Sequence, residues 1–201
     1  LSCDAAPADR PLVRLAALLH DLGKPLVRRM DESGVWTFHR HEEEGARIAR
    51  EILSRLRYPT AVIEGTAHLV GVHMFHYEPS WSDAAVRRFV VRVGEGNLAD
   101  LYALRRADAW GTSGAEPPAS FNLDISERVE AVLERGRALS IKDLAVGGED
   151  LAALGVPRGP RMGTILKELF ETVLEDPDSN ERETLLTIAR RLNERYGGPG
   201  I

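Results

Sequence analysis

Leu15-Ala16-Ala17-Leu18-Leu19-His20-Asp21-Leu22-Gly23-Lys24-Pro25 is the stretch around which we expect this chain to fold. An apolar helical run ends there in two adjacent polar side chains, just before a glycine of the kind that follows helix ends. Pro25 is expected to prevent the helix from resuming. Burying an imidazole and a carboxylate side by side costs free energy. Binding of a divalent metal ion by both groups is the usual compensation for that cost. The stretch therefore predicts a metal site at the end of the first helix.

Length and composition bound the class of protein. The chain has 201 residues, of which 43% are hydrophobic and 28% charged, as in an ordinary globular protein with its own core. The single cysteine, Cys3, excludes an internal disulfide and a thiolate-bound zinc site. The sequence contains neither a long apolar run nor a leader-like start, so we expect no membrane partner and a cytoplasmic location. Because the chain starts at Leu1 rather than at a methionine, we expect it to belong to a longer protein.

The net charge of −5 comes from the second half of the chain. Residues 1–110 hold 15 Lys and Arg against 15 Asp and Glu, whereas residues 111–201 hold 11 against 16. Bulk charge therefore does not indicate a nucleic-acid partner, and any such binding has to come from a local basic patch.

Apolar residues recur at helical spacing along most of the chain, and period-two alternation is nearly absent, so we predict an all-α fold. The first helix is expected to enter at Pro7–Asp9, with Asp9 as its N-cap, and the last to open with a capping box at Asn180–Glu183. A short extended piece is expected near 35–38 and an exposed linker over 111–120. Further helices are predicted over residues 41–56, 61–73, 82–93, 98–110, 124–139, 162–174 and 180–196.

Three more residues of metal-binding type stand at the edges of predicted helices: His41, His73 and Asp108. Side chains from separate helices can converge on one point in a bundle, so these residues together with His20 and Asp21 form a candidate metal cage. The mixture of imidazole and carboxylate suits Mg²⁺, Mn²⁺, Fe²⁺, Ni²⁺ or Co²⁺. The alternative for each residue is a polar role at a helix end, interacting with the helix dipole or with solvent.

The motifs resemble a known family. Similarity to the HD domain of bacterial tRNA CCA-adding enzymes and related poly(A) polymerases is carried by residues 18–25, 38–46, 69–73 and 107–109. Similarity to the carboxyl-terminal, tRNA-associated part of those proteins continues through residues 141–144, 148–151, 154–160 and 165–166. The resemblance thus implies an HD-domain helical bundle over residues 1–112 with a C-terminal helical appendage over residues 113–201.

The resemblance also implies an activity, a metal-dependent phosphohydrolase. His20 and Asp21 match the doublet that names the superfamily, Asp108 its closing aspartate, and His41 with His73 its intervening histidines; Lys24 matches a lysine that neutralises a substrate phosphate. The implied catalytic residues are His20, Asp21 and Lys24, and the implied substrates are phosphate esters or cyclic nucleotides. The family's first histidine has no counterpart among residues 1–19, and its nucleotidyltransferase head has none in this chain.

An interaction with tRNA, through the parent protein, is the second implication. Under it, Arg87, Arg88, Arg158 and Arg161 would contact phosphates, whereas on amphipathic helices such arginines usually form a solvated face. Trp36, Trp81 and Trp110 are interpreted as core or rim residues, with base stacking as the alternative. The competing hypothesis for the whole chain is a non-catalytic tRNA-binding module with a vestigial HD metal site.

Overall fold

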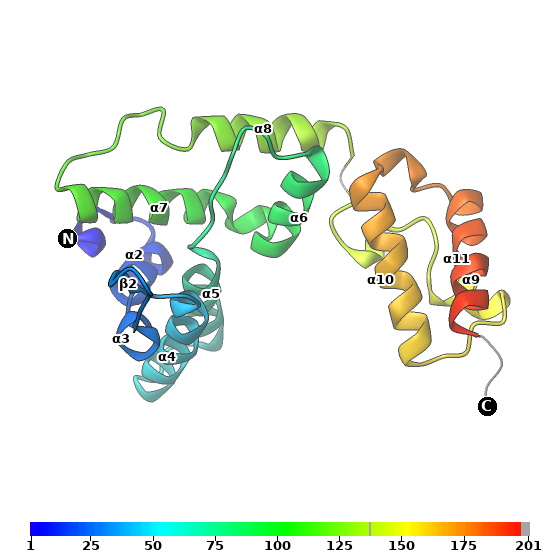
Figure 1. Cartoon of the computed structure of the whole chain (residues 1–201), viewed down its shortest axis with the longest axis horizontal. Helices are drawn as coiled ribbons and strands as arrows, with labels where there is room; N and C mark the ends of the chain where they lie inside the picture. The colour runs from blue at the N-terminus through cyan, green and yellow to red at the C-terminus, as the bar shows by residue number, and fades with distance from the viewer. Residues whose placement is uncertain (137, 198–201) are drawn as a thin grey trace. The chain divides into compact units, whose positions relative to one another are not determined.

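The computed structural model describes residues 1–136 and 138–197, which are almost entirely helical (Figure 1). The predicted all-α class is confirmed, and none of the described helices is long and apolar enough to cross a membrane. The only described strands, β1 (Arg29–Met30) and β2 (Trp36–Thr37), form an antiparallel ribbon that pairs Met30 with Trp36. The α-helices are α1 (Ser2–Ala5), α2 (Pro11–Leu19), α3 (Lys24–Val27), α4 (His41–Arg55), α5 (Thr60–Val72), α6 (Asp83–Val93), α7 (Leu98–Ser113), α8 (Leu123–Glu134), α9 (Gly148–Ala153), α10 (Pro160–Glu175) and α11 (Arg182–Tyr196).

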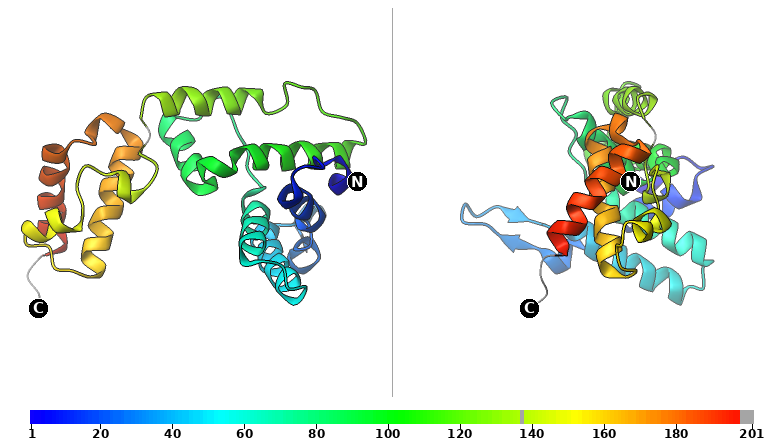
Figure 2. Two further views of the ribbon diagram at one scale, coloured as in Figure 1. Left: turned by 180° about the vertical axis from the view of Figure 1, so that it is seen from behind. Right: turned by 90° about the vertical axis from the view of Figure 1, so that its right-hand side faces the viewer.

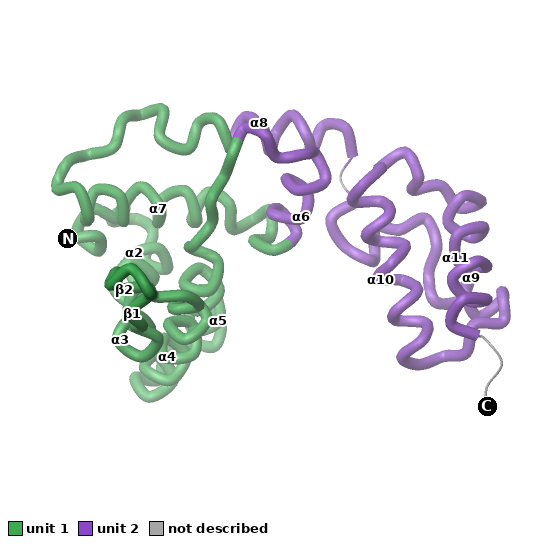
Figure 3. The backbone as a smooth tube through the Cα atoms, viewed as in Figure 1, with its two compact units in different colours: residues 1–78, 92–125 green, residues 79–91, 126–201 purple. Residues whose placement is uncertain are grey.

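Two compact units make up the chain (Figure 3). The first unit comprises residues 1–78 and 92–125, and the second comprises residues 79–91 and 126–201. These compact units are defined by contacts within the fold. The division into domains at residues 112 and 113, expected from the sequence, stays a prediction.

The first unit is built on the antiparallel pair α4 and α5, joined by a short connection around Pro59. Three glutamates in the first turn of α4 interact favourably with the helix dipole, and the apolar stripe of α4 faces α5. Small buried side chains, such as Ala49 and Ala67, let these helices approach closely, and α2 packs on both α5 and α7. Since the two helices run in opposite directions, the start of α4 and the end of α5 lie together (Figure 2).

The segment between α2 and α4 differs from the sequence expectation. α2 begins at Pro11 with Arg10 as its N-cap, so the N-cap role expected for Asp9 was wrong. Pro25 does not stop the chain from becoming helical again, because it occupies the first turn of the short helix α3. A proline there costs no hydrogen bond, since the N–H groups of a first turn lack helical partners anyway.

The second unit has a continuous apolar core in which α10 and α11 pack together. Its fully buried members include Leu151, Ile165, Leu169 and Leu185. The expected capping box of the last helix was wrong: α11 begins at Arg182, and Asn180 serves a different purpose. Its side chain accepts from the Ala145 N–H at 2.8 Å and donates to the Asp143 carbonyl at 3.0 Å, which ties a distant loop to the entry of α11.

Candidate metal centre

Three buried histidines stand at helix ends of the first unit and share one arrangement. His20 caps the end of α2, His41 begins α4 and His73 caps the end of α5. Each ring bonds through Nδ1 to the carbonyl three residues earlier, at 3.0, 2.8 and 2.7 Å respectively. A carbonyl can only accept, so Nδ1 carries a proton in all three rings, and each Nε2 is left to face the interior. This tautomer is the one in which histidines bind metals through Nε2.

The Nε2 atoms face two carboxylates. Nε2 of His20 lies 3.1 Å from Asp108 Oδ1 and 3.4 Å from Asp21 Oδ2, and Nε2 of His41 lies 3.6 Å from Asp21 Oδ1. The ring centre of His73 is 5.2 Å from those of both other histidines. One ligand atom each from His20, Asp21 and His73 falls within 4.8 Å of the others. All five predicted ligands are thus brought together by four helices, α2, α4, α5 and α7, and by the turn after α2.

A cation fits this place because two buried acceptor atoms oppose each other in it. Asp21 Oδ1 and His41 Nε2 are both buried, and neither has a hydrogen-bond partner among the described residues. In the neutral ring with its proton on Nδ1, His41 Nε2 presents a lone pair toward a carboxylate oxygen, which is unfavourable unless a positive centre lies between them. The donor set of three imidazoles and two carboxylates suits a first-row divalent ion or Mg²⁺ and excludes a soft, thiolate-type site.

The pKa shifts of the clustered side chains also indicate a place that suits positive charge. Burial lowers the pKa of His20, but the Asp108 hydrogen bond and the Asp21 charge outweigh it, so its pKa is raised. The pKa of Asp108 is lowered, chiefly by its hydrogen bond to His20. Burial lowers the pKa of His73, which keeps that ring neutral. The two carboxylates that would face a metal ion therefore favour positive charge at His20.

Asp108 lies inside α7 rather than at a helix edge, where the sequence had placed it. It nevertheless reaches the cluster because α7 crosses against α2 and α5. Lys24, at the start of α3, donates to Asp21 Oδ2 at 2.7 Å. Its ammonium group therefore stands beside the doublet, as predicted for a phosphate-neutralising residue, although that role stays a prediction.

Two glycines set the distance between the doublet and α4. A Cβ atom on Gly23 would lie 2.2 Å from the His41 carbonyl oxygen and 2.7 Å from the Gly45 nitrogen. A Cβ atom on Gly45 would lie 3.1 Å from the His20 carbonyl oxygen. Backbone from both sides meets here without intervening side chains, which holds His20 and Asp21 against the start of α4. Sequence reasoning took Gly23 only as a helix stop, and a single sequence carries no signal for this contact.

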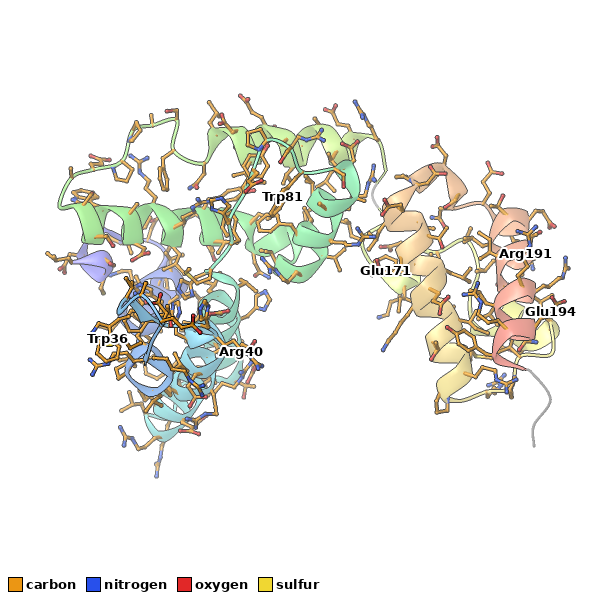
Figure 4. All side chains as sticks on the ribbon, viewed as in Figure 1. Trp36, Arg40, Trp81, Glu171, Arg191 and Glu194 are labelled. Atoms are coloured by element: carbon orange, nitrogen blue, oxygen red, sulfur yellow. The ribbon has the colours of Figure 1, made fainter. Side chains whose placement is uncertain are left out.

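An open hollow of about 580 Å³ lies over the cluster. Its lining includes Asp108 and His41 from the cluster, Lys24 at its edge, and Trp36, His39 and Arg40 from the ribbon and the segment that follows it. Figure 4 labels two of these, Trp36 and Arg40.

The predicted RNA-binding arginines all lie in the second unit but differ in accessibility. Arg87 is 3% exposed and donates to the Leu174 carbonyl at 3.0 Å, so its guanidinium is inaccessible to a phosphate. Arg88 is held by two carboxylates of α10, at 2.9 and 2.8 Å. Arg158 pairs with Glu149 on the surface, and Arg161 is partly exposed.

Comparison with curated proteins gives three informative relatives. The chain is 42% identical over 163 residues to a CC-adding tRNA nucleotidyltransferase of Thermus thermophilus, covering 81% of this chain and 36% of the relative. It is 40% identical to an A-adding tRNA nucleotidyltransferase of Deinococcus radiodurans, over 80% of this chain and 37% of the relative. It is 32% identical to a multifunctional CCA protein of Ectopseudomonas mendocina, over 74% of this chain and 39% of the relative. The chain thus spans less than two fifths of each of these relatives, and no solved structure matches it.

A family match covers the first part of the chain. The HD domain family matches residues 1–110, a range that contains the doublet, both further histidines and Asp108. With a match over more than half of its length, the chain belongs to the HD domain family.

Proposed function

We propose that the first unit is a metal-dependent phosphohydrolase and that the chain forms the carboxyl-terminal part of a CCA-adding-type tRNA nucleotidyltransferase. The observation that carries the first half is the pair of opposed buried acceptors, Asp21 Oδ1 and His41 Nε2, within a cluster of three histidines of matching tautomer. The second half is supported by the relatives named as tRNA nucleotidyltransferases.

His20, Asp21, His41, His73 and Asp108 would hold the ion. A bound divalent ion would supply a hydroxide at neutral pH and polarise a phosphoryl oxygen. Hydrolysis then joins the water oxygen to phosphorus, breaks the ester P–O bond and returns the proton to the departing oxygen.

The chain's own residues contribute orientation and charge. The carbonyl bonds to Nδ1 fix the three rings, so the site is organised before any ligand arrives. Lys24 is 39% exposed at the edge of the hollow, where its ammonium can leave Asp21 and neutralise a non-bridging phosphate oxygen.

Hydrolysis of bis(p-nitrophenyl) phosphate and of 2′,3′-cyclic AMP, with Mg²⁺, Mn²⁺ or Ni²⁺ added to metal-free protein, tests the first half. Asp21→Asn and His41→Gln should each lower the metal-dependent rate by at least about 100-fold. His76→Gln is the matched control, because that histidine is 84% exposed and pairs only with Glu78 among the described residues. Rates that do not respond to the two ligand variants would refute the phosphohydrolase assignment.

The non-catalytic alternative shares the tRNA interaction, which can be tested separately. Arg158 is 74% exposed, and its pair with Glu149 is of the surface type that contributes little to stability, so its guanidinium is available to a phosphate. We expect Arg158→Ala to weaken tRNA binding and to reduce the salt slope by about one unit. Affinity for tRNA that does not change with salt concentration would contradict the proposed tRNA interaction. Arg87 is left out of the proposed RNA surface because it is buried.

A further inference from the structure

Trp36 is an exposed indole that the proposed hydrolysis does not use. It sits on β2 with 46% of its surface exposed. Its one cation or ring partner among the described residues is Arg28, whose guanidinium carbon lies 4.2 Å from the ring centre. By contrast, Trp81 packs edge-on against Phe89, with the ring centres 5.9 Å apart. An exposed indole adds little to a core, so the ring of Trp36 is accessible to a ligand.

The ribbon places Trp36 at the wall of the hollow that also contains Asp108. The pairing of Met30 with Trp36 fixes the strand, and only four residues separate Trp36 from the ligand His41. The position of the indole is therefore tied to that of the metal cluster by a short length of chain. A volume of about 580 Å³ falls within the range of pockets that take small organic ligands.

The two parts of this hollow suit the two parts of a nucleotide. A divalent ion held by the metal ligands, together with the Lys24 ammonium, would offer positive charge and coordination to a phosphate. The indole offers a flat π face, and the Arg28 guanidinium stacked on it helps to hold the ring in place. Every nucleobase has a face that stacks on such a ring, whereas an aliphatic ester has none. His39 and Arg40 add hydrogen-bonding groups to the same wall.

We propose that Trp36, backed by Arg28, is a base-stacking and specificity-determining residue, and that the hollow takes phosphate esters bearing a nucleobase in preference to esters without one. The proposal rests on the proposed phosphohydrolase function and adds to it the part of the substrate that lies away from the phosphorus. Trp36 acts on binding of the substrate and does not touch the reacting atoms.

Paired substrates test this role. Trp36→Ala should raise KM for adenosine 2′,3′-cyclic phosphate about 5- to 150-fold, the range that loss of one base–aromatic stack produces. KM for glycerol 1,2-cyclic phosphate, which lacks a base, should not change, and kcat should hold for both substrates. Trp36→Phe should restore most of the affinity, because a phenyl ring still stacks. Equal effects on both substrates, or no effect on either, would overturn the proposal.

Tyr58→Ala is the matched control for loss of an exposed aromatic ring. Tyr58 is 39% exposed and follows the far end of α4, about 20 Å along the helix from His41 at 1.5 Å per residue. It should leave KM unchanged for both substrates. A rise in KM for the adenosine substrate equal to that of Trp36→Ala would show a general effect of removing surface rings and would overturn the assignment.

Fluorescence separates this proposal from the hydrolase proposal. In a Trp81→Phe, Trp110→Phe background, Trp36 is the only tryptophan of the chain. Titration with AMP in the presence of Mg²⁺ should quench its emission, and ribose 5-phosphate should not. Quenching by AMP would support the stacking role even if no substrate were hydrolysed. Absence of quenching, in a protein that hydrolyses bis(p-nitrophenyl) phosphate, would refute the stacking role and leave the hydrolase assignment standing.

Discussion

Gly23→Ala tests the contact that holds the metal-binding doublet against α4. The added Cβ would meet the His41 carbonyl oxygen at 2.2 Å and the Gly45 nitrogen at 2.7 Å. Both neighbours are backbone atoms, so no side chain can rotate away. The two segments would have to separate by more than about 1 Å to reach ordinary van der Waals contact.

The cost can be estimated from overpacked cores, where one extra methyl group destabilises by about 1–3 kcal/mol. Because the contact here is backbone to backbone, we expect the upper end, about 3 kcal/mol. In a chain of this length each kcal/mol lowers Tm by about 2–4 °C, so a fall of about 6–12 °C is expected in a thermal unfolding scan. The separation also moves His20 and Asp21 away from His41, so affinity for a divalent ion should fall in the same variant.

Gly96→Ala is the control. No described heavy atom lies within 4 Å of a Cβ at Gly96, and its φ is not positive, so Tm should change little. The reasoning would be refuted if Gly23→Ala melted within about 2 °C of the wild type and bound metal normally, since backbone this close cannot accept a methyl group without moving.

Three further changes probe other parts of the chain. Gly111→Ala would place a Cβ 2.7 Å from the Ser2 nitrogen, so α1 should detach from α7 and residues near Ser2 should become sensitive to limited proteolysis. Asn180→Ala removes two bonds to a distant loop and should destabilise the second unit by about 1–3 kcal/mol in urea unfolding. Burial raises the pKa of Asp83, but Arg128 outweighs it and the folded-state pKa lies below the ordinary 3.8. The resulting stabilisation is present above pH 4 and is lost as pH falls through the folded-state pKa, so Asp83→Asn should flatten the acid limb of a stability–pH curve.

The helical architecture was accessible from the sequence because its signals are local. Three glutamates before an apolar stripe predict the start of α4, and the observed helix begins at His41, as expected. The errors came from local signals that have two meanings. A proline ends a helix when it falls in the interior but fits the first turn, and Pro25 turned out to be the second case. Asn180 has the chemistry of a cap and uses it on a loop 35 residues away.

The site was accessible in its residue types but not in its geometry. Residue type and position at predicted helix ends singled out His20, His41, His73 and Asp108, and the resemblance matched the same residues. The antiparallel pairing of α4 with α5 explains why His41 and His73, 32 positions apart, meet. Two features could not be predicted from residue types, because both depend on backbone atoms. One is the hydrogen bond from Nδ1 of each histidine to a backbone carbonyl, and the other is the close backbone approach at Gly23. The hollow and the position of Trp36 at its wall depend on where the ribbon lies. Each strand of the ribbon has only two residues, too few for the sequence pattern to predict that position.

Calorimetric titration of metal-free protein with Mn²⁺ tests the central claim most directly. We predict one strong site in the wild type and in His76→Gln, and loss of that site in Asp21→Asn and His41→Gln, because the first variant removes a carboxylate charge and the second an imidazole ligand. A wild type with no strong site, or binding of undiminished strength in both ligand variants, would contradict the assignment of this cluster as the metal centre.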